Sequence, residues 1–407
     1  MRTERHHSVR LRGTPIGTIH HHDNEARFEF LDSHWEAPDR GVLGMWFEDN
    51  VGKPTRSSMR LPPWFSNLLP EGLLREWIAL DRGVSVSREL ELLLRVGADL
   101  PGAVQVLEDA GFPGSNDPET SQSIISRPSS ETETDNWRFS LAGVGLKFSM
   151  LRSGDRITLP GHHERGDWII KMPDPLHAYV PVNEYQTMTL AKLVGIEVPP
   201  IELLSRDVID NLPESAWIGN ENTAYAIKRF DRSENGSIHI EDFNQVRGFY
   251  PDAKYQGSYE TIGALAYRGT DFDSLLEFIR RLVFSFLIGN GDAHLKNWSF
   301  IYADGKHAHL SPAYDLVCTA PYAPANEVED LALKFGGTRR FSGIRRSAFQ
   351  RLAFKLGVDD AHILDTVTQT CALFVEAWRE RNRDPRIKFV DSWVDDHLED
   401  RLRQLVN

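Results

Sequence analysis

The sequence has few cysteines, no excess of positive charge and no long apolar run, and each shortage excludes a class of protein. Its two cysteines, Cys318 and Cys371, are too few for a disulfide framework and lack the paired spacing of zinc ligands, so we expect a reducing compartment. The net charge of −13 argues against nucleic acid binding through the chain's own field. A local basic patch or a DNA-binding partner is left as the route to DNA.

The apolar segments are too short and too interrupted to cross a membrane. The most apolar helical segment, residues 275–288, contains Glu277, Arg280 and Arg281 and is shorter than a bilayer-spanning helix. No apolar run resembling a signal peptide follows Met1. With 41% hydrophobic and 26% charged residues, the composition is typical of a globular protein. We expect it to be cytoplasmic and to have no membrane partner.

The periodicity of apolar residues changes along the chain. Residues 8–31 alternate like strands around a turn at Gly13-Thr14-Pro15, whereas residues 63–95 have helical spacing. Residues 113–136 are rich in proline, serine, threonine and acidic residues, which is typical of a mobile linker. The first part of the chain is therefore expected to form a unit of its own.

The rest of the chain divides into a strand-rich part and a helix-rich part. Residues 137–232 indicate short strands around one helix, and residues 258–407 mostly helix, interrupted by a hairpin at 298–311. We therefore predict an α+β fold. Its parts are an N-terminal α/β subdomain (1–112), a polar linker (113–136), a lobe with most of the strands (137–250) and a helical lobe (251–407).

The loop Gly289–Asn297 has the residue types that phosphoryl transfer requires. A kinase orients the accepting hydroxyl with one carboxylate, binds magnesium with a second carboxylate and an amide, and anchors the phosphates with a lysine. Asp292 and Asn297 lie five residues apart, as in the kinase catalytic-loop pattern H-R-D-x-x-x-x-N. Because the loop follows the apolar helix at 275–288, we expect that helix to hold it rigidly.

A predicted hairpin brings a second carboxylate to this loop. A strand at 298–302 is followed by the turn Asp304-Gly305 and by a returning strand at 307–310. The chain then reaches Asp315, which we expect to bind magnesium jointly with Asn297. The alternative is that Asp292 caps a turn and Asp315 a helix.

Two further residues of the loop have roles that the sequence leaves open. His294 could be a metal ligand with Asp292 and Asp315, as in a metal-dependent hydrolase. No H-x-H or H-E-x-x-H pattern supports this, so a structural or substrate-orienting role is favoured. Lys296 could neutralise the transferred phosphoryl group, or it could be a solvated loop lysine. Its place in the loop favours the first role.

A strand and a helix upstream offer an ion pair. The strand at 167–171 ends in Lys171, comparable to the kinase V-A-I-K strand that presents a phosphate-contacting lysine. The following helix, from about Asn183 to Leu193, has Glu184 in its first turn and could pair the two side chains. The alternatives are a solvated lysine at a strand edge and a glutamate that interacts with the helix dipole.

Two segments are candidates for nucleotide binding. Residues 140–147 supply two glycines and a lysine, which suits backbone amides approaching phosphates, although a strand-turn-strand with incidental glycines explains them equally well. The strand at 225–230 could become the hinge between the lobes, with Lys228 and Phe230 at the adenine, or could simply be a central strand. The candidate nucleotide ligands of the first segment are Ala142, Gly143, Val144, Gly145 and Lys147.

Taken together, these motifs resemble the HipA kinases, the toxin components of bacterial HipA/HipB toxin-antitoxin systems. The loop at 289–297 is similar to the family's G-N-x-D-A-H-x-K-N over its whole length. The other similar segments are Phe65–Gly72 (F-x-N-L-L-P-E-G), Ser140–Lys147 (S-x-A-G-x-Q-x-K), Asn183-Glu184 (N-E), Arg229–Arg232 (R-F-D-R), Glu241–Phe243 (within Q-E-D-F) and Leu310–Leu316 (L-x-P-x-Y-D).

The resemblance implies a two-lobed kinase fold behind an N-terminal subdomain, with ATP and Mg²⁺ as cofactors. It also implies that Asp292 is the catalytic base, that Asn297 and Asp315 bind magnesium, and that Lys171 contacts phosphate. Ser140 aligns with a loop serine that relatives autophosphorylate, which inactivates them. The expected substrate is a serine or threonine of a protein such as an aminoacyl-tRNA synthetase. The expected partner is a HipB-like helix-turn-helix antitoxin, through which alone DNA would be contacted.

Three residues depart from the family's pattern. Gly145 and Ile240 each replace a glutamine, and Val182 replaces a glutamate. None of these changes removes a magnesium ligand or a proton-transfer group, so we expect an active kinase. The alternative is a binding module with weak catalysis that acts mainly as the partner of a DNA-binding antitoxin, and Gly145 is the feature that favours it.

Overall fold

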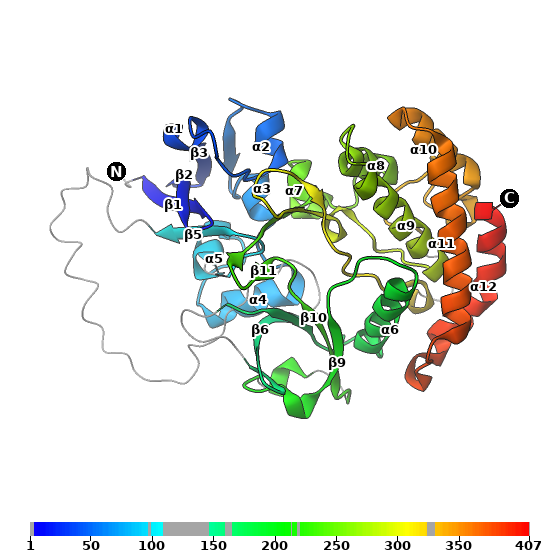
Figure 1. Ribbon diagram of the computed structural model, residues 1–407. Coiled ribbons are helices and arrows are strands. Elements are labelled where there is room, and N and C mark those ends of the chain that lie inside the picture. Colours follow the sequence, from blue (N-terminus) through cyan, green and yellow to red (C-terminus); the bar gives the residue numbers. More distant parts are fainter. Residues whose placement is uncertain are drawn as a thin grey trace.

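The computed structural model describes residues 4–96, 99–108, 146–158, 165–212, 214–217, 220–323 and 330–406. The N-terminal strands lie at one end of the molecule and the last three helices at the other (Figure 1). The molecule contains both helices and antiparallel sheets, and most helices lie in a different part of it from the sheets, which confirms the α+β prediction. The predicted linker at 113–136 lies outside the described residues.

The N-terminal unit, residues 4–108, is built on an antiparallel sheet with the strand order β4-β3-β2-β1-β5. Its strands are β1 (Arg5–Leu11), β2 (Thr14–His22), β3 (Glu25–Phe30), β4 (Thr55–Ser58) and β5 (Val104–Glu108). Its helices are α1 (Asp32–Trp35), α2 (Met45–Asp49), α3 (Pro63–Ser66), α4 (Gly72–Asp81) and α5 (Glu89–Val96). Strand alternation followed by helical spacing is therefore confirmed for this unit.

The first hairpin turns at Arg12 and Gly13, so the predicted turn at Gly13-Thr14-Pro15 is wrong in its position. Both residues have positive φ angles, 52° and 80°, as a two-residue turn that follows the twist of its strands requires. Thr14 and Pro15 already belong to β2, where Pro15 pairs with Arg10.

A second antiparallel sheet, with the order β7-β6-β8-β10-β9, forms the middle of the molecule. Its strands are β6 (Lys147–Ser153), β7 (Arg156–Thr158), β8 (Trp168–Lys171), β9 (Ile201–Ser205) and β10 (Thr223–Lys228). Phe148, Ile170 and Ala226 belong to the same apolar core as Val9 and Phe28 of the N-terminal unit. One core therefore runs from the first sheet into the second.

The opposite face of this sheet is covered by α6 (Val180–Leu193), which packs against β9 and β10. The helix begins three residues earlier than predicted, because Pro181 is compatible with the first turn and Tyr179 precedes it with a φ of 59°. Glu184 consequently lies in the second turn. Since dipole effects fade within the first turn, the helix-dipole alternative for Glu184 is wrong.

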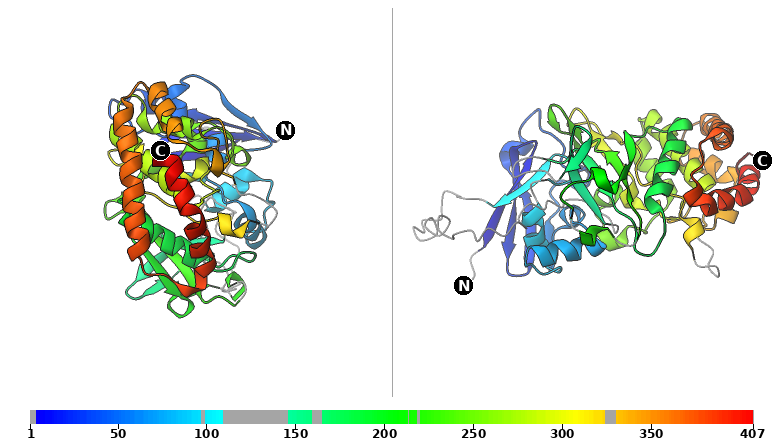
Figure 2. Two further views of the ribbon diagram at one scale, coloured as in Figure 1. Left: turned by 90° about the vertical axis from the view of Figure 1, so that its right-hand side faces the viewer. Right: turned by 90° about the horizontal axis from the view of Figure 1, so that it is seen from below.

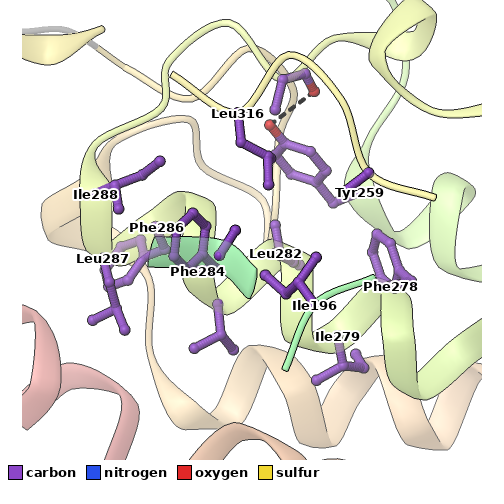
Figure 3. Packing of buried hydrophobic residues seen from close by; sticks show 14 of the residues in the cluster. Ile196, Tyr259, Phe278, Ile279, Leu282, Phe284, Phe286, Leu287, Ile288 and Leu316 are labelled. Carbon is purple, nitrogen blue, oxygen red and sulfur yellow. Dashed lines mark hydrogen bonds between the residues drawn. The ribbon is translucent and has the colours of Figure 1, made fainter. Parts of the chain in front are cut away.

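The helical lobe is organised around α9 (Phe272–Ile288), which packs against three helices, α8, α11 and α12, and against the strand β15 (His309–Leu310). Its helices are α7 (Phe243–Val246), α8 (Tyr259–Tyr267), α10 (Arg346–Leu356), α11 (Asp360–Glu380) and α12 (Lys388–Val406). Figure 3 shows Phe278, Leu282 and Phe286 of α9 among the apolar side chains of this core. The last two helices lie side by side along the end of the molecule (Figure 2).

The predicted hairpin at 298–311 is confirmed. It consists of β14 (Ser299–Tyr302) and β15 (His309–Leu310), and β13 (His239–Asp242) completes this sheet in the order β13-β14-β15. The short 3₁₀ helix η4 (Leu295–Asn297) leads into β14. The sheet thus joins the candidate catalytic loop to the chain that follows the second sheet.

Buried polar contacts attach the N-terminal unit to the rest of the molecule. Arg229, which follows β10, lies with its Nη1 3.1 Å from Asp99 Oδ1 of the N-terminal unit, and both side chains are buried. Glu241 of β13 accepts hydrogen bonds from the Met45 backbone N–H (2.8 Å) and from Trp64 Nε1 (2.9 Å). In the described part of the chain, no helix has the length and apolar character needed to cross a membrane.

Candidate active site

The described candidate residues line one cavity of about 1020 Å³ between the N-terminal unit, the second sheet and the helical lobe. The candidates found in its wall are Lys147, Lys171, Glu184, Lys228, Phe230, Asp292, His294, Lys296, Asn297 and Asp315. Ser140, Ala142, Gly143, Val144 and Gly145 lie outside the described residues. Candidate residues up to 168 positions apart in the sequence, Lys147 and Asp315, therefore meet at a single site.

Two lysines lie opposite each other on neighbouring strands of the second sheet, in the wall of the cavity. Lys147, the first residue of β6, is the register partner of Lys171 in β8, and Lys171 is also the partner of Tyr225 in β10. Burial, with a contribution from Lys171, lowers the pKa of Lys147 to about 8 although Asp315 acts in the opposite direction. Like charges in this arrangement destabilise a sheet. Their presence in a cavity wall indicates a site for an anion.

Lys171 is held between two carboxylates. Its Nζ lies 2.5 Å from Glu184 Oε1 of α6 and also contacts Asp315. Burial opposes the charge of the lysine, but Asp315 and Glu184 raise its pKa above the ordinary value. The alternative of a solvated lysine at a strand edge is therefore wrong. The ion pair between Lys171 and Glu184 that the sequence suggested is present.

Asp315 lies in an unusual backbone conformation. Its φ of 56° is in the left-handed region, which costs energy for a residue with a side chain and is often found at functional sites. Although burial favours the neutral acid, Lys171 and Lys147 hold the pKa of Asp315 below its ordinary range. No described helix begins at this residue. Asp315 is thus an ionised carboxylate in the cavity and not a helix cap.

The Asp292 side chain is fixed by a residue that the sequence analysis missed. Tyr255 donates its hydroxyl to Asp292 Oδ1 at 2.7 Å. The backbone of Asp292 is held as well, because its carbonyl accepts from Asn297 Nδ2 (2.9 Å) and its N–H donates to Asn290 Oδ1 (3.0 Å). The turn at 292–294 is closed by the Asp292 carbonyl, so the carboxylate is not used as a turn cap.

The rest of the loop is held by residues that precede it in the sequence and by residues that follow it. Tyr259 donates its hydroxyl to the Ala293 carbonyl at 3.1 Å, and Tyr314 donates to the Lys296 carbonyl at 3.0 Å. Gly289, with a φ of 72°, ends α9, and a Cβ there would lie 2.3 Å from the Trp393 ring. The expected support of the loop by α9 is therefore joined by contacts from α8, α12 and the segment after β15.

His294 is almost completely enclosed. Burial lowers its pKa, and its ring meets Tyr255 edge to face at a centroid distance of 5.1 Å. Its Nδ1 is buried and has no hydrogen-bond partner in the described structure. In the parts of the chain that the structure describes, Asp292, His294 and Asp315 do not bring ligand atoms together in a metal-binding cluster. The metal hydrolase alternative has no support there.

Lys296 points away from solvent and toward the N-terminal unit. Its Nζ lies 3.0 Å from Glu71 Oε1 and 3.1 Å from the backbone oxygen of Asn67. The side chain is only 4% exposed. The alternative of a solvated loop lysine is therefore wrong, and the ammonium group is already surrounded by acceptors.

β10 is both a central strand and part of the cavity wall. It lies between β8 and β9, and the Lys228 N–H donates to the Pro200 carbonyl at 2.8 Å. Phe230 follows the strand, lines the cavity and packs near Tyr314 at a centroid distance of 5.8 Å. The two interpretations of this segment are compatible with each other.

The donor set fits a nucleotide with magnesium. Asn297 and Asp315 offer the oxygen ligands that Mg²⁺ prefers, and Lys147 and Lys171 offer positive charge to phosphates. Glu71, Lys254 and Tyr255 also line the cavity but were missed. Glu71 lies in the Phe65–Gly72 motif, which could have indicated its place in the site. Lys254 and Tyr255 belong to no motif, and only the tertiary fold brings them to the loop.

Two family models match the chain, the HipA N-terminal domain over residues 7–107 and the HipA-like C-terminal domain over residues 139–378. The chain is 40% identical over 400 residues to the protein named "Putative kinase Y4dM" of Sinorhizobium fredii, covering 96% of this chain and 95% of that protein. It is 26% identical over 298 residues to the serine/threonine-protein kinase toxin HipA of Shewanella oneidensis, covering 66% and 65%.

A solved structure has the same fold over nearly the whole chain. It is the Shewanella oneidensis complex of HipA, HipB and operator DNA, which matches with a TM-score of 0.72 and 20% identity over 98% of this chain and 97% of that chain. This likeness confirms the predicted two-lobed, kinase-like fold with its N-terminal subdomain.

Proposed function

This chain belongs to the HipA family of kinases, and we propose that it transfers the γ-phosphate of ATP to a serine or threonine of another protein. The observation that carries the proposal is the half-buried pair Lys147 and Lys171, which stand in register and line the same cavity as Asp292. Their two ammonium groups would attract a polyphosphate. Asp292 is then available to orient a hydroxyl for attack on the phosphoryl group.

The remaining side chains divide the work between them. Lys171, and with it Lys147, would hold the phosphates, while Asn297 and Asp315 would hold Mg²⁺. The bound ion supplies positive charge that neutralises the phosphate oxygens. Lys171 is shared by Glu184 and Asp315. If Asp315 held Mg²⁺, Glu184 would still keep the lysine in place, as the corresponding glutamate does in protein kinases.

Regulation is proposed at Ser140. The family motif at Ser140–Lys147 ends in a lysine that lines the cavity, and Ser140 precedes this lysine by seven residues in the sequence. We propose that Ser140 is autophosphorylated and that this modification ends the activity. Ser140→Ala should therefore phosphorylate the substrate for longer than the wild type, whereas Ser129→Ala in the polar linker should inactivate at the wild-type rate. A Ser140→Ala protein without substrate activity would mean that the serine has a structural role.

The proposed protein substrate is a component of translation such as an aminoacyl-tRNA synthetase, as the family resemblance implies. The proposed partner is a HipB-like helix-turn-helix antitoxin, in line with the Shewanella complex of HipA, HipB and operator DNA. With a net charge of −13, this chain would contact DNA only through that partner.

The test is transfer of labelled γ-phosphate by the purified protein in the presence of Mg²⁺. We expect incorporation at Ser140 and into a synthetase, located by mass spectrometry. Asp292→Asn should reduce transfer by about 10²- to 10⁴-fold, the usual range for a missing general base. Asp396→Asn, an exposed aspartate of α12, is the matched control and should behave as the wild type. If the wild type and Asp292→Asn are equally silent while ATP binds, the chain is instead a binding module.

A further inference from the structure

A segment of the N-terminal unit lies directly against the candidate catalytic loop. Asn67 and Glu71 are separated from Lys296 by more than two hundred residues, yet both contact its ammonium group. Asn67 and Glu71 also line the cavity. In the fold, α3 of the N-terminal unit packs against α7, and α7 packs against η4 of the loop. The N-terminal unit thus forms part of the wall of the active site.

Lys296 contacts this segment through two hydrogen bonds to Asn67 and an ion pair with Glu71. Its Nζ lies 3.1 Å from the Asn67 backbone oxygen, 3.1 Å from Asn67 Oδ1 and 3.0 Å from Glu71 Oε1, and Asp242 Oδ2 follows at 3.5 Å. Asn67 is itself fixed, since its Nδ2 donates to the Phe249 carbonyl at 2.7 Å. A lysine held in this way anchors the backbone to which it belongs.

Glu71 joins two lysines that flank the proposed catalytic residues. One carboxylate oxygen lies 3.0 Å from Lys296 and the other 3.0 Å from Lys254. Lys254 directly precedes Tyr255, whose hydroxyl holds Asp292, and Lys296 directly precedes Asn297. The Lys254 carbonyl also accepts from the Leu295 N–H at 3.1 Å. One carboxylate therefore braces both the side that holds Asp292 and the side that carries Asn297.

The charge of Glu71 is secure. Burial disfavours its ionised form, but Lys296 and Lys254 together lower its pKa to about 2. At any working pH the carboxylate is therefore negative and attracts both ammonium groups. Breaking such an enclosed cluster by removing one partner leaves the others without compensation.

We infer that Glu71 is a positioning residue for phosphoryl transfer, through which the N-terminal unit fixes the geometry of the catalytic loop. The inference rests on the proposed function and adds a dependence of the active site on the N-terminal unit. Glu71 acts through Lys254 and Lys296 and needs no contact with the transferred phosphate. Whatever moves the segment at 67–71 would misalign Asp292 and Asn297 together.

The test compares Glu71→Gln with Glu48→Gln. Glu48 is the matched control because it forms a partly exposed ion pair with Arg40 in the same N-terminal unit, away from the cavity. Glu71→Gln should lower kcat by about tenfold to a hundredfold, the range for a misplaced catalytic group, with little change in KM for ATP. Glu71→Asp, which keeps the charge, should recover part of the rate. Glu48→Gln should retain the wild-type kcat.

A second variant tests the route through the lysine. If Glu71 acts through Lys254, each single substitution breaks the same Glu71–Lys254 ion pair. The double variant Glu71→Gln/Lys254→Met should therefore be no slower than the slower single variant. Multiplying losses, or a Glu71→Gln protein with the wild-type kcat, would overturn the inference.

Amide hydrogen exchange separates this inference from the proposed function. We expect Glu71→Gln to exchange faster than the wild type at residues 289–297 while the core helix α9 stays protected. This readout needs no catalysis, so it remains decisive if the wild type transfers no phosphate and the proposed function fails. Unchanged exchange at 289–297 would mean that Glu71 does not anchor the loop.

Discussion

Lys171 Nζ lies 2.5 Å from Glu184 Oε1, which ties the last residue of β8 to the second turn of α6. The contact crosses the cavity wall, and Asp315 meets the same ammonium group from the helical lobe. One lysine thus connects the strand, the helix and the segment after the β14–β15 hairpin. Removing the charge of Lys171 therefore tests how much the alignment of these three elements matters.

Replacing Lys171 by methionine should abolish most of the phosphate transfer. The loss of the charge removes the phosphate contact and leaves Glu184 and Asp315 without the cation that they share, so we expect kcat/KM to fall by on the order of a hundredfold or more, or about 3 kcal/mol. Steady-state kinetics with ATP measure this. Glu184→Gln should cost less, because the ammonium group that contacts the phosphates remains. Lys192→Met, at an exposed position of α6, should have no effect, and an equal loss there would contradict the assignment.

Removal of the Tyr255 hydroxyl should slow the chemical step. Without its 2.7 Å hydrogen bond, the Asp292 carboxylate has more freedom to rotate away from the substrate. We expect Tyr255→Phe to lower kcat by about tenfold, as for other lost hydrogen bonds to charged groups, with ATP affinity unchanged. Tyr267→Phe in α8 is the control. A Tyr255→Phe enzyme with the wild-type kcat would show that Asp292 is oriented without the tyrosine.

His239 should make the protein less stable in acid. Its Nε2 lies 2.7 Å from the Leu43 carbonyl in a buried site between the N-terminal unit and β13, and burial lowers its pKa to about 4 from 6.5. Because the folded-state value is depressed, the stabilisation is complete above pH 6.5 and is lost as the pH falls toward 4. The difference corresponds to on the order of 3 kcal/mol.

Denaturant unfolding between pH 7.5 and pH 4 measures this dependence. His239→Gln should flatten the curve over that window, whereas His362→Gln, at an exposed position of α11, should leave it as in the wild type. A curve that keeps its slope in His239→Gln would assign the acid sensitivity to other groups.

Gly289 should tolerate no side chain. A methyl group there would lie 2.3 Å from the Trp393 ring, and the φ of 72° is itself strained for alanine. Gly289→Ala should lower the free energy of unfolding by roughly 2 to 4 kcal/mol, the sum of backbone strain and overpacking. Gly357→Ala is the control, since its φ is 69° but the space beside it is open, and it should cost only about 1 kcal/mol. Equal losses would mean that Trp393 yields without cost.

Local patterns predicted the elements of the site better than their contacts. The strand ending at Lys171 and the hairpin before Asp315 follow from alternation and turn residues, and both are present. The start of α6 was misplaced because Pro181 fits a first helical turn, where proline was not expected from the pattern. The position of the turn at Arg12 was not predicted, because an arginine with a positive φ has no sequence signature.

The contacts that orient the catalytic loop could not be predicted from spacing. Tyr255 and Asp292 are 37 residues apart, and the distance between them is set by how α8 and α9 pack. Lys296 was predicted at the loop, but its direction depends on Asn67 and Glu71 of a separate unit. Motifs indicate which residues carry the chemistry, whereas the packing of distant elements decides where each side chain points.

The apolar core that Val9 and Phe28 share with Phe148 and Ile170 also limits how this chain can evolve. A recombination event that exchanged residues 139–378 with a distant relative would separate the two halves of one packed interior. Both halves must therefore be inherited together, and a change of volume at Phe148, whose ring centroid lies 6.2 Å from that of Trp77, selects for a compensating change in α4. The second sheet thus depends on the N-terminal unit for part of the apolar core in which it is packed.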